Sequence, residues 1–310
     1  MIGREAEPEA GFTVGICATG EAVGLGRLVR SMAGEAGRGP CRLLKLVVVA
    51  SDCPRSTLAE VRQVCEEDPR VHLVVEDARR GKAEAINRIL SLAGGEFVVL
   101  VNSDAVPERG ALTELLGSIR RDEKVGAVSA VPIPSGGRGP ASLLSEFMWT
   151  AHNDCSLALN HMNLSNHSSD ELVAFRLDAI RELPEGSVND GAYLAMIARI
   201  KGFSIKVCQS ARVRIRTPSR VSDLVSQRRR IIFGHTQVWR RTGVAPKTIE
   251  SLIIFSPLIG TRILIATVAR RPAFLFALPI ALVGEVLASV LSIVDAVVSS
   301  RRHVVWRRFA

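Results

Sequence analysis

The stretch Gly95-Glu96-Phe97-Val98-Val99-Leu100-Val101-Asn102-Ser103-Asp104-Ala105-Val106-Pro107 decides the fold. Its apolar run, 97–101, is rich in valine, which is typical of a strand that is buried on both faces. The run stops at three polar residues, with a proline just beyond them. In open α/β sheets ligands bind at the carboxyl ends of the strands, so Asp104 is the first residue that we expect to take part in chemistry.

Strand-like and helix-like patterns alternate around this stretch. The apolar runs at 12–18, 43–50, 71–76 and 97–101 are expected to be strands. The stretches that follow them are expected to be helices, which end near residues 32, 66, 92 and 121. These spacings allow right-handed parallel crossovers, so residues 10 to about 130 are predicted to form a doubly wound α/β sheet.

The pattern changes beyond this region. Strands are expected at 125–131, 172–175 and 203–207, and helices at 141–159 and from Asn189-Asp190 to Ile200. The polar stretch 160–170 is interpreted as a mobile substrate loop or a solvated one. His152, His161 and His167 share neither a helical face nor a ligand-like spacing, so we predict no metal site from them.

Charge and composition restrict the partners. The 310 residues carry a formal net charge of +9, which suits a phosphorylated substrate, anionic lipid or nucleic acid. No stretch interleaves aromatic and basic residues into a stacking platform for bases, so we predict no nucleic-acid partner. The most basic region lies between Arg212 and Arg241, and its guanidinium groups are candidates for a diphosphate clamp. The six scattered cysteines are interpreted as reduced thiols in the cytosol.

The two ends of the chain differ in character. Residues 1–10 are predicted to be a flexible N-terminus without a secretory signal. Residues 241–300 hold two apolar segments, about 249–269 and 272–298, and the second is long enough to cross a bilayer. A two-helix hairpin would leave a basic tail, 301–310, in the cytosol but would place Arg270 and Arg271 on the opposite side. Two alternatives therefore remain: an interfacial first helix, or two buried helices of a soluble domain.

Four segments resemble the inverting family 2 glycosyltransferases, and the layout of the C-terminal part resembles the membrane-attached, cellulose-synthase-like branch of that family. The segments are Arg80 to Asn87, Asn102-Ser103-Asp104, Asn189-Asp190 and Gln227 to Ile231. The resemblance covers about residues 12 to 235. It implies a GT-A fold, a doubly wound mixed sheet, as the catalytic domain at 11–240, followed by membrane helices.

The resemblance implies a divalent metal, Mg²⁺ or Mn²⁺, on the diphosphate of the sugar donor. Asn102-Ser103-Asp104 matches the family's Asp-x-Asp metal motif, with asparagine in place of the first carboxylate. Asp104 is the implied metal ligand, and phosphate oxygens complete the oxygen ligands that a hard cation prefers. Asn102 stays in the donor site without a charge, which is expected to weaken the affinity for the metal.

Other matching positions are implied to bind the nucleotide. Lys82 lies in a segment that resembles Gly-Lys-x-x-Ala-x-Asn, at the start of a predicted helix, where free N–H groups favour an anion. Looser matches after the first two strands place Ala18, Glu21 and Asp52 near the base or ribose.

The last two segments carry the chemistry of transfer. Asn189-Asp190 resembles the family's Glu-Asp-x-x-Leu segment, which makes Asp190 the implied general base for the acceptor hydroxyl. Gln227 and Arg230 match the Gln-x-x-Arg-Trp motif of the cellulose-synthase-like branch, whereas Ile231 replaces its tryptophan. That replacement favours a single transfer over the synthesis of a polymer.

The leading hypothesis is a membrane-bound inverting hexosyltransferase with its catalytic domain facing the cytoplasm. GDP-mannose is the first candidate for the donor and a polyprenyl-linked glycan for the acceptor, with UDP-glucose and UDP-N-acetylglucosamine as alternatives. One rival is a sugar-nucleotide pyrophosphorylase-like enzyme, for which Thr19 to Gly24 is a poor activating loop. The other is an inactive membrane-bound binder of nucleotide sugars.

Overall fold

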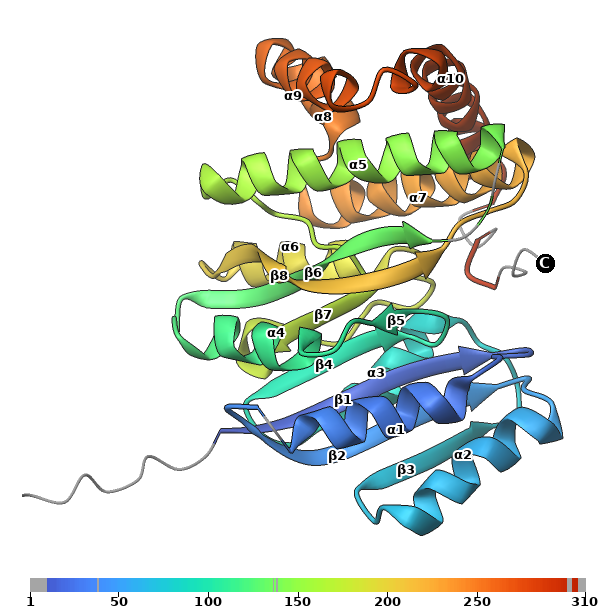
Figure 1. Ribbon diagram of the computed structural model, residues 1–310, viewed down its shortest axis with the longest axis vertical. Coiled ribbons are helices and arrows are strands. Elements are labelled where there is room, and N and C mark those ends of the chain that lie inside the picture. The colour runs from blue at the N-terminus through green and yellow to red at the C-terminus, as the bar shows by residue number, and fades with distance from the viewer. Residues whose placement is uncertain (1–9, 38, 136, 138, 300–302, 306–310) are drawn as a thin grey trace, which may run out of the picture.

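The computed structural model describes residues 10–299 except 38, 136 and 138, together with residues 303–305. Within these residues an eight-stranded sheet has the order β3-β2-β1-β4-β7-β6-β8-β5. Helices cover both of its faces, and a further layer of helices lies beyond the β6 and β8 side (Figure 1). Two predicted segments lie mostly outside the described residues. They are the flexible N-terminus, of which only residue 10 is described, and the basic tail, of which only residues 303–305 are described.

The first half of the sheet is parallel. β1 pairs in parallel with both β2 and β4, and β2 pairs with β3. The strands are β1 (Gly11–Thr19), β2 (Arg42–Ser51), β3 (Val71–Glu76) and β4 (Phe97–Asn102). Each lies within two residues of its expected bounds, which confirms the doubly wound half.

The second half makes the sheet mixed. β7 (Leu172–Arg176) runs antiparallel to β4 and to β6 (Val125–Ser135), while β6 and β8 (Ser204–Arg216) are parallel. The two-residue β5 (Val106–Pro107) closes the edge on β8. β8 is longer than predicted, because alternating arginines and apolar residues continue it past a register shift at Ala130/Val131. Its arginines point to solvent, as is typical of a strand with one wet face.

Two apolar layers hold the sheet between helices. On one face α1 (Leu25–Ala36), α2 (Arg55–Glu67) and α4 (Ala111–Arg120) share one apolar cluster with Phe97, Val99 and Val101 of β4. On the other face α3 (Lys82–Leu92) and α6 (Asp190–Ile200) pack against Val98 and Leu100. The run 97–101 is therefore buried on both faces, as its composition predicts.

The remaining helices form the outer layer. They are α5 (Pro140–His161), α7 (Val221–Thr242), α8 (Ile249–Phe255), α9 (Pro257–Arg270) and α10 (Phe274–Val298). The apolar segment predicted at 249–269 is two helices, because Pro257 cannot donate a backbone hydrogen bond and starts a new helix. The sequence analysis did not identify α7, whose many arginines hide its apolar face.

Candidate active site

A large cavity begins at the carboxyl ends of β1 and β4 and continues between α5, α7, α8 and α10. Its volume is about 1110 Å³, large enough for a nucleotide sugar and part of an acceptor. Most of the predicted binding residues contribute to its wall, namely Ala18, Lys82, Asn102, Asp104, Gln227 and Arg230. The fold thus brings to one site side chains that are far apart in the chain.

Asp190 lies at the first position of α6. Its neighbour Asn189 caps the helix by accepting a hydrogen bond from the Ala192 backbone N–H, 3.2 Å away. The capping role therefore falls to Asn189, and the Asp190 side chain is left to pair with Lys82, with Oδ2 2.9 Å from Nζ. Asp190 is only 4% exposed, so this carboxylate meets its charged partner inside the protein.

Lys82 begins α3, directly after Gly81, whose φ of 110° is a conformation that side chains rarely adopt. Burial by itself would lower the pKa of Lys82, but the carboxylates of Asp190 and Asp170 raise it above its ordinary value. The lysine is therefore charged. In this structure its partner is Asp190, while its place at a helix N-terminus in the cavity wall still suits an approaching anion.

Asp170 is a member of the site that the sequence analysis did not identify. Its carboxylate packs closely against α6. A Cβ at position 191 would lie 2.3 Å from Asp170 Oδ1, so only glycine fits at that position. Burial, and then the charge of Asp190, raises the pKa of Asp170 to about 7, against the opposing charge of Lys82. Asp170 therefore exchanges a proton near neutral pH beside the candidate base.

We expect Asp170→Asn to stabilise the protein at pH 8. A carboxyl whose pKa is raised on folding binds more protons in the folded state, so the free energy of unfolding falls as pH rises from about 4 to about 7. Removing the charge should abolish this fall and raise Tm by several degrees at pH 8, since each kcal/mol is worth about 2–4 °C. Thermal unfolding followed by tryptophan fluorescence at pH 5 and pH 8 tests this; a lower Tm at pH 8 would contradict it.

Asn102 and Asp104 lie beside Glu171, a second residue that sequence analysis did not identify. The amide of Asn102 donates a hydrogen bond of 2.9 Å to Glu171 Oε2, from the neighbouring strand end. Burial, and then the nearby Asp104 charge, raises the pKa of Glu171. Glu171 thus places a second carboxylate beside Asn102-Ser103-Asp104, in which asparagine replaces the first carboxylate of the family's motif.

These oxygens fit a divalent cation that is shared with phosphates. Asp104 and Glu171 offer carboxylate oxygens and Asn102 has an amide oxygen, which suits a hard cation such as Mg²⁺ or Mn²⁺. Among the described residues there is no group of three or more His, Cys, Asp or Glu arranged to hold a metal on its own. Such a site needs further ligands from a bound diphosphate.

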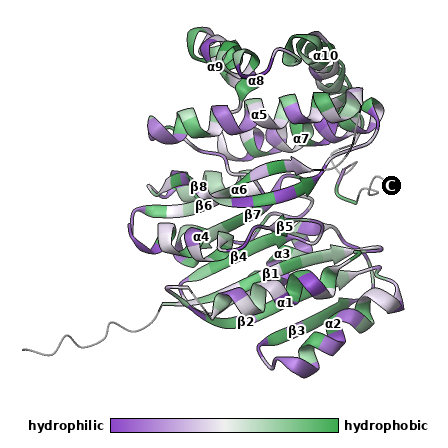
Figure 2. Ribbon diagram, viewed as in Figure 1, coloured by the Kyte–Doolittle hydropathy of each residue, from purple (hydrophilic) through white to green (hydrophobic). Residues whose placement is uncertain are grey.

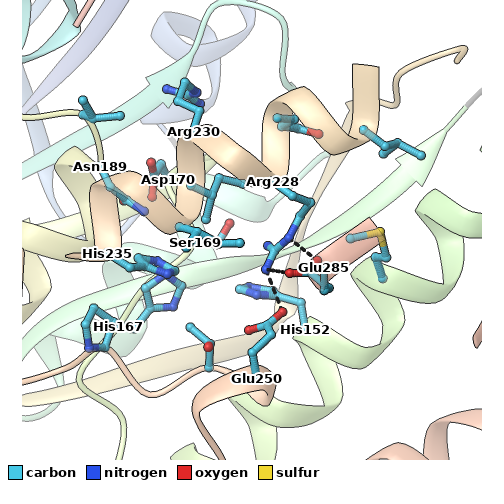
Figure 3. A pocket seen from close by; sticks show the side chains of 18 of the residues that line it. His152, His167, Ser169, Asp170, Asn189, Arg228, Arg230, His235, Glu250 and Glu285 are labelled. Atoms are coloured by element: carbon cyan, nitrogen blue, oxygen red, sulfur yellow. Dashed lines mark hydrogen bonds and ion pairs between the residues drawn. The ribbon is translucent and has the colours of Figure 1, made fainter. Parts of the chain in front are cut away.

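The arginines of α7 have different roles. Arg230 faces the acidic group, and burial lowers its pKa against the opposing charges of Asp170 and Asp190. Arg228 instead pairs with Glu250 and Glu285, at 2.7 Å and 2.5 Å (Figure 3). Arg230 therefore lies near the buried carboxylates, whereas Arg228 holds α7 to α8 and α10.

Three predicted site residues do not line the cavity wall: Asp190, which is buried against the wall residue Lys82, and Glu21 and Asp52. Glu21 and Asp52 are exposed on neighbouring loops, joined by a backbone hydrogen bond of 3.1 Å from Gly20 to the Asp52 carbonyl. Asp52 has a φ of 52°, typical of a tight turn. The loops follow β1 and β2, and the wall residue Thr19 is the last residue of β1.

The polar stretch 160–170 was predicted to be a mobile substrate loop or a solvated one, and only its first part, residues 161–164, is exposed. Ser165, Asn166, Ser168 and Ser169 are buried. His152 and His167 meet with ring centroids 5.7 Å apart, and His167 meets His235 of α7 at 5.1 Å, whereas His161 is exposed (Figure 3). Burial lowers the pKa of His152 to about 4 and of His167 to about 3, so this row of imidazoles is neutral at physiological pH.

The mixed sheet, with an acidic group at the carboxyl ends of its central strands, has the architecture of GT-A nucleotide-sugar transferases. The chain belongs to glycosyltransferase-like family 2, whose model matches residues 8–234. No curated protein matches the chain.

Solved structures of low sequence identity share this fold. The mannosyltransferase PcManGT from Pyrobaculum calidifontis, in complex with GDP-Man and Mn²⁺, is 21% identical with a TM-score of 0.62, over 94% of this chain and 90% of that one. Glucosyl-3-phosphoglycerate synthase from Mycobacterium tuberculosis, in complex with Mn²⁺ and UDP-glucose, is 18% identical with a TM-score of 0.50, over 77% of this chain and 81% of that one. These likenesses confirm the predicted GT-A fold.

Proposed function

We propose that the protein is a membrane-attached inverting hexosyltransferase, which moves one sugar from a nucleotide diphosphate donor to a lipid-linked acceptor on the cytoplasmic side. The observation that carries the proposal is the buried Asp190, which lies next to Lys82 beside a cavity that joins Asp104 to the apolar outer helices. The intact acidic group favours an active enzyme over an inactive binder.

The chemistry follows from these positions. Asp190 accepts the proton of the acceptor hydroxyl while that oxygen attacks the anomeric carbon of the donor. The bond from the acceptor oxygen to this carbon forms, the bond from the carbon to the phosphate oxygen breaks, and the nucleoside diphosphate leaves from the opposite face. Lys82 and Arg230 supply positive charge near the reacting groups.

The proposed metal is Mg²⁺ or Mn²⁺, held by Asp104 with Glu171 beside it. When bound, it would neutralise the charge that develops on the leaving diphosphate. Mn²⁺ is present in the complexes of PcManGT and of glucosyl-3-phosphoglycerate synthase, which supports this proposal. Asn102 orients Glu171 through its amide.

GDP-mannose is the proposed donor. PcManGT, whose structure contains GDP-Man, resembles this chain over nearly its full length and therefore includes the outer helices. UDP-glucose is the second candidate, because glucosyl-3-phosphoglycerate synthase has the same fold around that donor. Glu21 and Asp52 stand where the base or ribose is expected, and we propose that one of them reads it once the donor is bound.

We propose that the row His152, His167 and His235 contacts hydroxyl groups of the acceptor sugar. The row lines the cavity between Asn189 and the outer helices (Figure 3). Neutral imidazoles both donate and accept hydrogen bonds, as sugar hydroxyls require. Ser169 Oγ and His235 Nε2 are buried without a hydrogen-bond partner, so polar groups of the wall remain to be satisfied.

His167→Phe should therefore raise the acceptor KM by roughly 2–10-fold, the loss expected for one neutral hydrogen bond, and leave donor affinity unchanged. Phenylalanine keeps the ring packing between His152 and His235. His161→Phe, on the exposed end of α5, is the matched control and should change neither value. An equal loss of acceptor and donor affinity in His167→Phe would show that the histidine only supports the fold.

The function is tested with the detergent-solubilised protein, Mn²⁺ or Mg²⁺, membrane lipid extract and a panel of labelled GDP- and UDP-sugars. Label from GDP-mannose that moves into the lipid fraction is the expected result. Transfer from a UDP-sugar alone would replace the proposed donor. Nucleotide binding without turnover would favour the inactive binder.

A further inference from the structure

The outer helices expose an extensive apolar surface. α10 is long and apolar enough to cross a membrane, and among the described helices it alone meets that criterion of length and composition. Figure 2 shows that hydrophobic residues dominate α10. One of its faces is buried against the protein at Phe274, Ala277, Ala281, Ala288 and Asp295, and the opposite face exposes Phe276, Leu282, Val283, Val286, Val290, Ile293 and Val297.

The connection between α9 and α10 is bound to the catalytic domain. Arg270 pairs with Asp154 of α5 at 3.0 Å, and Arg271 pairs with Glu146 of the same helix. Phe274 packs its ring on Phe147, with centroids 5.4 Å apart. The tip of this helical hairpin therefore lies on α5, whose acidic side chains keep it out of a hydrocarbon layer.

The other end of α10 is bound to the same domain. Asp295, fully buried, pairs with Arg229 of α7 at 2.5 Å, and His303 Nε2 lies 2.7 Å from Asp295 Oδ2. Beyond it, the Val304 carbonyl oxygen lies so close to Gly81 of the active site that a Cβ there would be 2.9 Å away. Both ends of α10 thus contact the domain that binds the donor.

This arrangement is incompatible with a membrane crossing. α10 is about 37 Å long, and a helix that crosses the hydrocarbon core has its ends about 30 Å apart on opposite sides. α9 is about 21 Å long, too short to cross, and it lies along α5, with Thr267 hydrogen-bonded to Asp154 at 2.7 Å. Because the catalytic domain holds both ends of α10, these two ends lie on one side of the membrane.

We propose that α8, α9 and α10 form a monotopic platform that lies in one leaflet of an anionic bilayer, with no helix crossing it. The proposal refines the membrane attachment of the proposed function. The exposed Arg262 of α9 suits anionic headgroups, and the side chains of Arg270 and Arg271, although paired with α5, are still 64% and 48% exposed. The last two are on the wrong side in a transmembrane hairpin, whereas in the platform they stay on the cytoplasmic side.

Two variants report the side on which the hairpin tip lies. Ala273→Cys in the tip and Asp178→Cys on the exposed surface of the catalytic domain are expressed as the full chain in sealed, inside-out and right-side-out vesicles. A membrane-impermeant maleimide, with the modified peptides identified by mass spectrometry, should label both positions from the same side. Labelling of Ala273→Cys only from the side opposite to Asp178→Cys would overturn the platform.

A second measurement identifies what covers the apolar face. We expect the detergent-depleted protein to float with vesicles of phosphatidylcholine and phosphatidylglycerol, and Val283→Glu/Val290→Glu to reduce the floated fraction at least tenfold. Val75→Glu, at an exposed valine of β3, is the control and should float normally. A stable dimer that does not float would assign this face to a second copy and overturn the proposal. Neither measurement depends on sugar transfer, so each can overturn the platform while the proposed transfer reaction, tested by labelled sugars, still stands.

Discussion

Asp190→Asn should reduce sugar transfer by roughly 10²–10⁴-fold, the range typical of a lost general base. Asparagine has nearly the same size and still offers an oxygen to Lys82, now 2.9 Å from the carboxylate, so the cavity should keep its shape. It does not accept a proton from the acceptor hydroxyl. The effect should therefore fall on kcat, with the dissociation constant of the donor within about threefold of the original value.

Isothermal titration with the nucleoside diphosphate and steady-state transfer assays separate these two effects. Asp178→Asn is the matched control, because Asp178 is exposed on the same domain and outside the cavity. An equal loss of binding and turnover in Asp190→Asn would assign Asp190 a structural role through Lys82. A full loss of turnover in Asp170→Asn, with Asp190→Asn active, would move the base to the neighbouring carboxylate.

The sequence analysis identified the parts of the site that local patterns encode. The apolar run of β4 and the polar turn after it are contiguous, so the place of Asp104 followed from hydrophobic periodicity and the rule for strand ends. The start of α6 could also be predicted, because Asn189 and Asp190 precede a helical pattern. Structure then divided their roles, with Asn189 as the cap and Asp190 as the partner of Lys82.

The residues that were not identified depend on pairings between distant segments. Asp170 and Glu171 precede β7, whose antiparallel place beside β4 is not encoded in either segment. His235 meets His167 only because α7 packs over the loop before β7. A local signal existed for the acidic pair, since two adjacent carboxylates end a polar stretch just before an apolar run, but the same pattern is typical of a solvated strand start.

The C-terminal helices show the same limit. Composition predicted apolar segments correctly, and it offered both a crossing hairpin and an interfacial helix. The platform proposed above rests on the ion pairs that hold the tip to Asp154 and the far end of α10 to Arg229. Such long-range pairs are determined by packing, and no periodicity in the sequence reports them.

Asp104→Ala should weaken donor binding in the presence of Mn²⁺ by at least about 10–100-fold, the loss typical even of outer partners of a metal site. Glu171→Gln should weaken it less, because glutamine keeps an oxygen for the amide of Asn102, now 2.9 Å away, and loses only the charge. When EDTA removes the metal, both variants should bind the donor as weakly as the unmutated protein does in EDTA. The measured quantity is the dissociation constant of the nucleotide sugar, by titration with and without Mn²⁺.

Glu108→Gln provides the matched control for both substitutions. Glu108 directly follows β5, but it pairs with Arg214 at 3.0 Å, and neither residue lines the cavity. Unchanged Mn²⁺ dependence in Asp104→Ala would place the metal elsewhere. A loss in Glu171→Gln as large as that in Asp104→Ala would make Glu171 a direct ligand. In that case the carboxylate missing from Asn102-Ser103-Asp104 is supplied by the neighbouring strand, and Asn102 serves to hold it in place.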